Sequence, residues 1–399
     1  MNSRIPGLPA ALLLMVSCLH AHTIYSVTVV PINAGLNVAA VNGHDLVTGN
    51  TPDPLQGGAQ VAAIFDVNAG TTTKLTLPAG YGYASGAWIN QSGNIAGYLP
   101  YTDTGAGSND FFYYDAQTQQ YTVFHTPGGL SPYITGMNDS GTIVGYTSEG
   151  SFEASVGGGV QTLTITPPGG STNTFFAALA INNSGQIVGS WALPPHSGCG
   201  FEYPATATYC IFNPDTPGAA DSSQFDAINN SGLAIGNYYP PSVFLAVTFD
   251  GTSLGDLGDL NSGSGNAFTT AGAGCGGFQS VFAGGINDAG DVVGCGAQNL
   301  NLADYFDLGY SGPMVYTGGT WEHFADGSYV IPGWQPVALW AIDNLGAIKG
   351  EAVGPGCIGC TVVFEPGAHV TAPEPSGGLL ALCGVLSAFL FRRKAGARP

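Results

Sequence analysis

The residues of this chain that could bind or transform a ligand are aromatic side chains and carboxylates, grouped in segments between predicted strands. Aromatic rings present apolar faces to a sugar, and neighbouring carboxylates accept hydrogen bonds from hydroxyls or coordinate Ca²⁺. These residues form our candidate binding face: Tyr101, Asp103, Asp110, Trp191, His196, Tyr203, Asp304, Tyr305, Asp307 and Tyr310. The alternative is that they are ordinary polar loop residues.

Catalytic motifs are absent from the sequence, which has no GxSxG, HExxH or phosphate-loop pattern. A glycan-cleaving enzyme needs two converging carboxylates, for which Asp304 and Asp307 are the nearest candidates. The histidines between residues 22 and 372, which we call the body of the chain, are scattered singly. We therefore predict no catalytic residue, no bound metal and no cofactor, with Ca²⁺ as the one ion that the acidic loops would suit.

Six cysteines of the body fall into three local pairs, which predicts disulfides in an oxidising compartment. The pairs are Cys199 with Cys210, Cys275 with Cys295, and Cys357 with Cys360. The last pair also fits a redox motif or half a zinc site, but no second such pair and no nearby histidine support that alternative.

One motif recurs seven times along the body. An apolar residue precedes an asparagine, and glycines follow it at three and seven residues, as in Ile181, Asn182, Gly185 and Gly189. The asparagine starts a turn through its own backbone, the first glycine adopts a positive φ, and the second admits a neighbouring backbone. The motif positions are Asn42, Asn90, Asn138, Asn182, Asn229, Asn287 and Asp343, and only the first copy lacks the first glycine, with Asp45 in its place.

Each motif predicts a strand, a tight turn and a strand, and further apolar strands follow, such as 111–115 and 121–124. In the fourth unit the third and fourth strands are predicted at 210–212 and, weakly, at 221–225. Four antiparallel strands per repeat match one blade of a β-propeller. A spare strand at 25–30 precedes the first motif, and the seventh unit lacks a fourth strand. We predict an all-β, seven-bladed β-propeller over 22–368, closed by 25–30; an open β-solenoid and stacked sandwiches are the alternatives.

The repeats resemble the extracellular HAF repeat family, in segments such as 180–189 and the aromatic strand 110–115. The His-Ala-Phe signature itself is absent. The resemblance spans most of 39–365, and it implies an extracellular β-repeat architecture without an established activity.

Alternate connections of a four-stranded blade open on opposite faces. The motif turns are short and occupy one face, which we call the turn face. The longer connections carry the candidate residues and all three cysteine pairs, and open on the other, the loop face. They are 99–110, 193–209, 261–282, 299–312 and 353–360. Variable loops on a rigid scaffold are where binding sites are usually built, so we expect binding on the loop face.

Residues 1–21 have the order of a secretory signal peptide: Arg4, an apolar run at 8–19, and small residues ending at Ala21. A buried N-terminal helix and a lipid-modified Cys18 rank below plain cleavage.

The other end has a linker, 369–376, an apolar run, 377–391, and a basic tail, 392–399. Fifteen helical residues reach about 22 Å, and snorkelling arginines could extend this toward the roughly 30 Å hydrocarbon core. The positive-inside rule places the tail in the cytoplasm. We therefore predict a C-terminal transmembrane helix.

Pro373, Glu374 and Pro375, the apolar run and the basic residues Arg392 and Arg393 together resemble the PEP-CTERM sorting signal of Gram-negative bacteria. The resemblance covers about 372–395. It implies recognition of these residues by an exosortase, a stage in the inner membrane, and delivery to the cell envelope, cell surface or extracellular matrix.

The net charge of the chain is −19, and most of its few cations are terminal. Between 22 and 372 only Lys74 and Lys349 oppose 25 acidic residues, about −23 in total. Such a surface excludes nucleic acid and anionic lipid as partners, because both require cationic contacts. The sequence thus favours an exported, non-enzymatic surface protein that binds envelope polysaccharide, with an extracellular glycan-active propeller enzyme, a hydrolase or lyase, as the alternative.

Overall fold

The computed structural model describes residues 23–30, 37–42, 46–100, 109–164, 175–193, 196–203, 208–209, 222–239, 245–257, 268–269, 285–297, 311–324, 329–330 and 333–366. The predicted signal peptide, sorting motif and membrane helix lie outside these residues. Within the part of the chain that is described, no helix has the length and apolar character needed to cross a bilayer.

Antiparallel strands dominate the described structure, and we number the units by their motifs. The first three units are β2 (Asn37–Val41), β3 (Leu46–Asp53), β4 (Ala59–Asp66) and β5 (Thr71–Lys74); β6 (Ser85–Ile89), β7 (Ile95–Pro100), β8 (Asn109–Asp115) and β9 (Gln120–His125); and β10 (Tyr133–Met137), β11 (Ile143–Thr147), β12 (Gly150–Ser155) and β13 (Gly159–Thr162). Each of these units is a four-stranded sheet with its strands in sequence order. Short 3₁₀ turns lie at η2 (Pro54–Gln56) and η3 (Pro127–Gly129).

The fourth and fifth units are joined by one parallel pair, Gly198 with Ser222. Their strands are β14 (Phe176–Ile181), β15 (Ile187–Leu193), β16 (His196–Tyr203) and β17 (Thr208–Tyr209), then β18 (Ser222–Ile228), β19 (Ala234–Tyr239), β20 (Leu245–Phe249) and β21 (Leu254–Asp256). The sixth unit contains β22 (Phe268–Thr269), β23 (Val292–Ala297), β24 (Ser311–Thr317) and β25 (Thr320–His323). The seventh contains β27 (Gln335–Ile342), β28 (Ile348–Gly354) and β29 (Cys357–Pro366).

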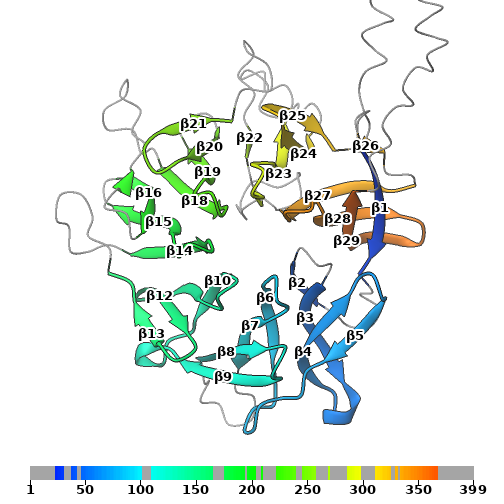
Figure 1. Ribbon diagram of the computed structural model, residues 1–399, viewed down its shortest axis with the longest axis vertical. Coiled ribbons are helices and arrows are strands. Elements are labelled where there is room, and N and C mark those ends of the chain that lie inside the picture. The colour runs from blue at the N-terminus through cyan, green and yellow to red at the C-terminus, as the bar shows by residue number, and fades with distance from the viewer. Residues whose placement is uncertain are drawn as a thin grey trace, which may run out of the picture.

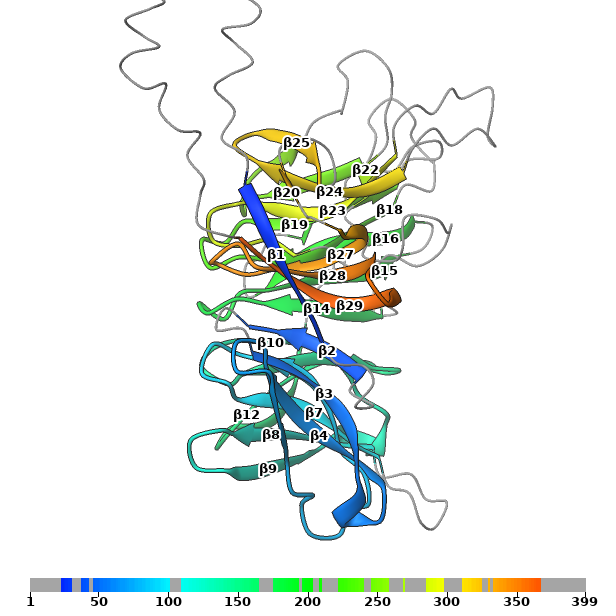
Figure 2. The ribbon, with the colours of Figure 1, turned by 90° about the vertical axis from the view of Figure 1, so that its right-hand side faces the viewer.

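The units are arranged around a common centre, with the first strand of a unit, such as β2, β6, β10 or β27, toward the centre (Figure 1). Viewed from the side, the strands run across the thickness of the disc (Figure 2). This is the arrangement of a β-propeller.

The hydrophobic core lies between neighbouring sheets, in seven clusters of buried residues among those described. Val144 of the third unit, for example, packs with Ile187 and Phe201 of the fourth. The last unit packs on the first in the same way, because Val363 shares a cluster with Val47. Each sheet therefore buries both faces only when both neighbours are present.

The N-terminal strand β1 (Thr23–Val29) pairs antiparallel with β29, in a register from Tyr25 opposite Pro366 to Val29 opposite Val362. This confirms the predicted pairing of 25–30 with the last unit. Tyr25 is 6% exposed, and its ring centroid lies 5.0 Å from that of Phe324 in the sixth unit. The other edge of β1 pairs in parallel with β26 (Tyr329–Val330). Two strands far apart in the sequence, β1 and β29, thus lie side by side in one sheet.

The second motif glycine allows the close backbone approach that its spacing predicts. A Cβ added to Gly145 would lie 2.2 Å from the carbonyl oxygen of Tyr133, on the paired strand. No side chain fits there. The same contact recurs at Gly97, Gly189, Gly236 and Gly350.

Two predictions for the strands were wrong. In the fourth unit the third strand is β16, which begins after only two residues and not at 210; the predicted fourth strand at 221–225 belongs to β18, the first strand of the next unit. Gly198 and Gly200 hide β16 from a propensity pattern, yet a Cβ at Gly200 would lie 2.6 Å from the Phe225 ring. In the seventh unit, 353–360 was predicted as one of the longer connections, but it is a hairpin between β28 and β29.

Lys349 is a buried cation where the last unit meets the first. It occupies β28 opposite Val363, and its side chain is 5% exposed with Nζ 5.3 Å from the Trp340 ring centroid. Burial lowers the pKa of Lys349 from 10.5 to about 8. At the same motif position the other units have Thr48, Ala96, Val144, Val188, Ile235 and Val293.

Replacing Lys349 with methionine should remove this desolvation cost. Between pH 8 and 10.5 the unfolded chain keeps the lysine proton that the folded chain releases, so wild-type stability should rise with pH. We expect Lys349→Met to be more stable at pH 7 by roughly 3 kcal/mol, an advantage that shrinks through that window. Urea unfolding of both proteins at several pH values measures the difference, and parallel pH profiles would refute it.

Deleting residues 23–30 should expose the edge of β29 and uncover the cluster around Phe324. We expect the single unfolding transition to be lost or the Tm to fall by more than about 10 °C, because several buried side chains lose their partners. Thermal unfolding followed by circular dichroism tests this. Ser26→Ala, an exposed change in the same strand, serves as the control, and an unchanged melt for the deletion would contradict strand closure.

Candidate functional site

The motif turns are built by the asparagine that opens them. In the second unit, Asn90 Oδ1 accepts hydrogen bonds from the backbone N–H groups of Ser92 (3.1 Å) and Asn94 (3.0 Å). The Gly93 N–H donates to the Asn90 carbonyl over 2.9 Å, and Gly93 has φ +79°. Both features confirm the turn chemistry predicted from the sequence.

The same asparagines also tie neighbouring units together. Five of the six buried asparagine side chains use Nδ2 to donate to the backbone carbonyl of the motif residue in the next unit, whereas Asn287 Nδ2 donates to Asp291 Oδ2 of its own unit over 3.0 Å. The bonds run from Asn42 to Asn90 (2.7 Å), Asn90 to Asn138 (3.3 Å), Asn138 to Asn182 (3.1 Å), Asn182 to Asn229 (3.0 Å) and Asn229 to Asn287 (3.0 Å). These five bonds form an inner ladder around the centre of the ring.

The residue after each motif asparagine forms an outer ladder. Its backbone N–H donates to the side-chain Oδ1 of the corresponding residue in the next unit. The bonds run from Gln91 to Asp139 (3.0 Å), Asp139 to Asn183 (2.8 Å), Asn183 to Asn230 (2.9 Å), Asn230 to Asp288 (2.8 Å) and Asp288 to Asn344 (2.8 Å). Three side-chain amides add bonds to the second carboxylate oxygens. Asn183 Nδ2 donates to Asp139 Oδ2 over 2.6 Å. Asp288 Oδ2 accepts from Asn230 Nδ2 (2.9 Å) and Asn344 Nδ2 (2.7 Å).

Among the described residues, the inner ladder ends at Asn287 in the sixth unit and the outer ladder at Asn344 in the seventh. Asp343 stands where the other units have asparagine, and a carboxyl group has no N–H to donate. Gly43 stands where the outer ladder needs a side-chain acceptor. The sequence thus supplies neither of these side-chain groups at the junction that contains Lys349 and that β1 closes.

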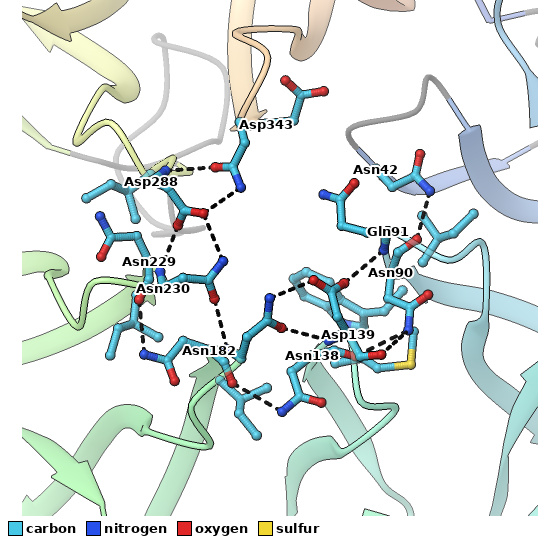
Figure 3. Close-up of a pocket in the computed structure, with 18 of the residues that line it drawn as sticks. Asn42, Asn90, Gln91, Asn138, Asp139, Asn182, Asn229, Asn230, Asp288 and Asp343 are labelled. Atoms are coloured by element: carbon cyan, nitrogen blue, oxygen red, sulfur yellow. Dashed lines mark hydrogen bonds between the residues drawn. The ribbon is translucent and has the colours of Figure 1, made fainter.

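The ladders line a pocket at the centre of the turn face, with about 800 Å³ of empty space that is partly open to solvent (Figure 3). The outer-ladder residues, the motif residues and the apolar residues before them form its wall. Among the described residues that line it, none is lysine or arginine, while Asp139, Asp288 and Asp343 contribute carboxylates.

Trp88 adds an aromatic surface to this wall. It is 37% exposed, and its Nε1 donates to the carbonyl of Ile134 in the next unit over 3.3 Å, which holds the ring in place. The other six units have alanine or glycine at this position: Ala40, Gly136, Ala180, Ala227, Gly285 and Ala341. The fold therefore does not require a large residue here.

This arrangement can bind a neutral molecule that carries several hydroxyl groups. Amides donate and accept, carboxylates accept, and the indole presents an apolar face. An anionic ligand would meet only negative charge. Within the described part of the chain, no three His, Cys, Asp or Glu residues group closely enough to hold a metal ion.

Asp110 of the candidate binding face lies at the beginning of β8, on the side away from the motif turns. Its Oδ2 accepts from the Tyr81 hydroxyl (2.6 Å), and its Oδ1 lies 2.6 Å from Nδ1 of His125, whose side chain is 74% exposed. The loop-face location fits the prediction, and a role in binding stays a prediction.

Trp191 and Tyr203 do not belong to a loop-face surface. Trp191 is 1% exposed and stacks on Phe176 with ring centroids 5.8 Å apart, so its indole is part of the core. Tyr203 is opposite Ile187, close to the Asn182 turn, because β16 starts earlier than predicted. Both assignments are corrected by the strand register.

Most other predicted residues lie outside the described part. They are Tyr101, Asp103, Asp304, Tyr305, Asp307, Tyr310, Cys210, Cys275, Pro373, Glu374, Pro375, Arg392 and Arg393. The backbones of His196, Cys199, Cys295 and Cys357 lie in strands, but their side chains are not described. Cys360 is disulfide-bonded; its pairing with Cys357 stays a prediction.

Sequence reasoning assigned the turn face a structural role only and so missed the pocket. Two signals could have pointed to it. Six of the seven motif residues are Asn rather than Asp, although both residues can start such a turn. Trp88 is the one bulky residue at a position otherwise occupied by alanine or glycine.

No family model and no curated protein matches this chain. Among solved structures it is similar to the β-propeller domain of the Trilobed protease from Pyrococcus furiosus, at 9% identity and TM-score 0.47, over 88% of this chain and 98% of that one. It is also similar to the extracellular domain of a proposed hybrid two-component system from B. thetaiotaomicron, at 11% identity and TM-score 0.45, over 86% of this chain and 39% of that one. An oligogalacturonate lyase in complex with manganese matches at 10% identity and TM-score 0.47, over 84% of this chain and 89% of that one.

The chain thus spans well under half of that extracellular-domain chain and nearly all of the protease's propeller domain. Identities and scores this low say nothing about activity. The fold assignment rests on the strand order and on the packing between sheets.

Replacing Asn138 with aspartate should break one inner-ladder bond while keeping the turn. Oδ1 can still accept from the Thr142 N–H, but the donor to the Asn182 carbonyl is lost. We expect a loss of about 1–3 kcal/mol in the free energy of unfolding, measured in urea. Asp343→Asn is the matched control, because it makes the reverse exchange at a motif position whose side chain is not part of the inner ladder; an equal loss in both variants would contradict the ladder.

Proposed function

We propose that this chain is an exported surface protein, folded as a closed seven-bladed β-propeller, that binds neutral polysaccharide in its central pocket and catalyses no reaction. The observation that carries this proposal is the lining of the pocket. It combines amide and carboxylate groups with one fixed indole, Trp88, and no cation among its described lining residues.

The charge of the chain supports a neutral ligand. With only Lys74 and Lys349 between the two ends, the body has no cationic surface for an acidic polymer. Lys349 is buried, and Lys74 is engaged with the Pro52 carbonyl (2.7 Å) and Asp53 (3.8 Å). Uncharged hydroxyl groups satisfy amides and carboxylates without any of these cations.

The terminal segments support export. A signal peptide at 1–21 and a sorting tail that resembles PEP-CTERM sequences suit delivery by an exosortase through the inner membrane to the cell envelope, cell surface or matrix of a Gram-negative bacterium. The disulfide at Cys360 fits an oxidising compartment.

A glycan-cleaving role has less support. Both oxygens of Asp139 and of Asp288 accept hydrogen bonds from neighbouring turns, which assigns these carboxylates to the outer ladder. Asp304 and Asp307, the candidates from the sequence, lie outside the described residues.

Replacing Trp88 with alanine should weaken binding of neutral oligosaccharides. Loss of one aromatic contact is worth about 0.5–1.5 kcal/mol, or roughly a 2- to 10-fold rise in Kd. Glycan-array screening of the purified full chain, with and without Ca²⁺, selects a ligand, and titration calorimetry compares the variants. Val156→Ala, an exposed apolar change outside the pocket, is the control. Binding of acidic glycans only, or an unchanged Kd for Trp88→Ala, would contradict the proposal.

A further inference from the structure

A group of aromatic rings is exposed on the loop face, at the border of the third and fourth units. Tyr133 stacks on Tyr146 with ring centroids 5.1 Å apart and 15° between the planes. Phe175 meets Tyr146 edge-on at 5.9 Å. Tyr133 is 57% exposed and Phe175 is 40% exposed. We call these three residues the aromatic platform.

The aromatic platform lies opposite the central pocket. Tyr133 begins β10, which ends at the Asn138 turn, and Phe175 precedes β14, which ends at the Asn182 turn. Five residues of extended strand separate Tyr133 from Asn138, roughly 16 Å. The inner strands cross the disc, so the two features face opposite sides (Figure 2).

The fold does not require these rings. The residue pair corresponding to Tyr133 and Tyr146 is Asn37 with Asn50 in the first unit, Ala177 with Ser190 in the fourth and Gln224 with Asn237 in the fifth. In the second unit it is Ser85 with Tyr98. Among these paired strands, only the third unit has aromatic residues at both positions. The pair therefore departs from the repeat in the way that Trp88 does.

The platform is held rigidly by its surroundings. The Tyr98 hydroxyl accepts from the Ile134 N–H (2.8 Å) and donates to the Ile134 carbonyl (3.3 Å), which anchors the strand next to Tyr133. Preorganised aromatic faces bind apolar surfaces with little loss of side-chain entropy. The tyrosine hydroxyls border these faces, and neither lysine of the body is available to attract an acidic chain.

We infer that the aromatic platform is a second site for a neutral saccharide chain, and that one molecule bridges two polysaccharide chains through its opposite faces. This inference rests on the proposed function for the central pocket. A bridging protein would cross-link a matrix without forming oligomers.

The test is a sandwich assay on the purified full chain. Dextran, a neutral β-1,3-glucan or a neutral galactomannan is immobilised, protein is bound, and the same polysaccharide in labelled form is added. Tyr133→Ser with Tyr146→Asn uses residue types found at these positions in other units, and Trp88→Ala removes the pocket ring. Melting curves and light scattering check that every variant is folded and monomeric.

We expect wild type to capture the labelled chain. The platform variant and Trp88→Ala should each still bind the immobilised chain, and each should capture at least about 2-fold less labelled chain than wild type. The combined variant should bind the immobilised chain more weakly than either single variant and capture the least label. Full capture by the platform variant would overturn the inference and leave the pocket proposal intact. If Trp88→Ala behaves as wild type while the platform variant loses all binding, the pocket proposal fails and bridging fails with it.

Discussion

The ring depends on a property of the asparagine side chain, which can accept and donate hydrogen bonds at the same time. In the motif, Oδ1 accepts from the turn backbone, and Nδ2 remains free to reach the next unit, as Asn138 does with the Asn182 carbonyl. Aspartate would keep the first bond and lose the second. The seven units differ greatly in the rest of their sequence, yet six have asparagine at this point. The requirement to join units explains that choice, and the turn alone does not.

Local turn chemistry and periodicity made the repeat and the pairing of the N-terminal strand predictable. Both depend on residues near one another in sequence, or on a strand left without a partner at each end. The third strand of the fourth unit was missed because Gly198 and Gly200 weaken its pattern, and only the packing against Phe225 of the next unit explains Gly200. The inner ladder was missed because its donors act between units about fifty residues apart. Packing and bonding between units cannot be obtained from one unit's pattern.

The two candidate binding features are departures from the repeat. Positions that maintain the ring are the same in nearly every unit, because each must fit an identical junction. A large aromatic residue where the other units have alanine or glycine, as at Trp88, has no such structural requirement. The same holds for Tyr133 and Tyr146. Sequence reasoning searched the long connections of the loop face for binding residues, whereas these side chains lie in the regular strands, where comparison between units reveals them.

The last-to-first junction also departs from the repeat, and this has a consequence for the pocket. Asp343 and Gly43 lack the side-chain groups that form the two ladders at most other junctions, and apolar packing and the β1 pairing join the ends of the ring. A pocket with identical wall segments would bind a ligand in several equivalent orientations. This one has an indole between the second and third units, and a carboxylate, Asp343, in the seventh unit where the other six units have asparagine. These two features break the pseudo-symmetry of the wall, which would allow a single orientation for the saccharide that we propose as the ligand.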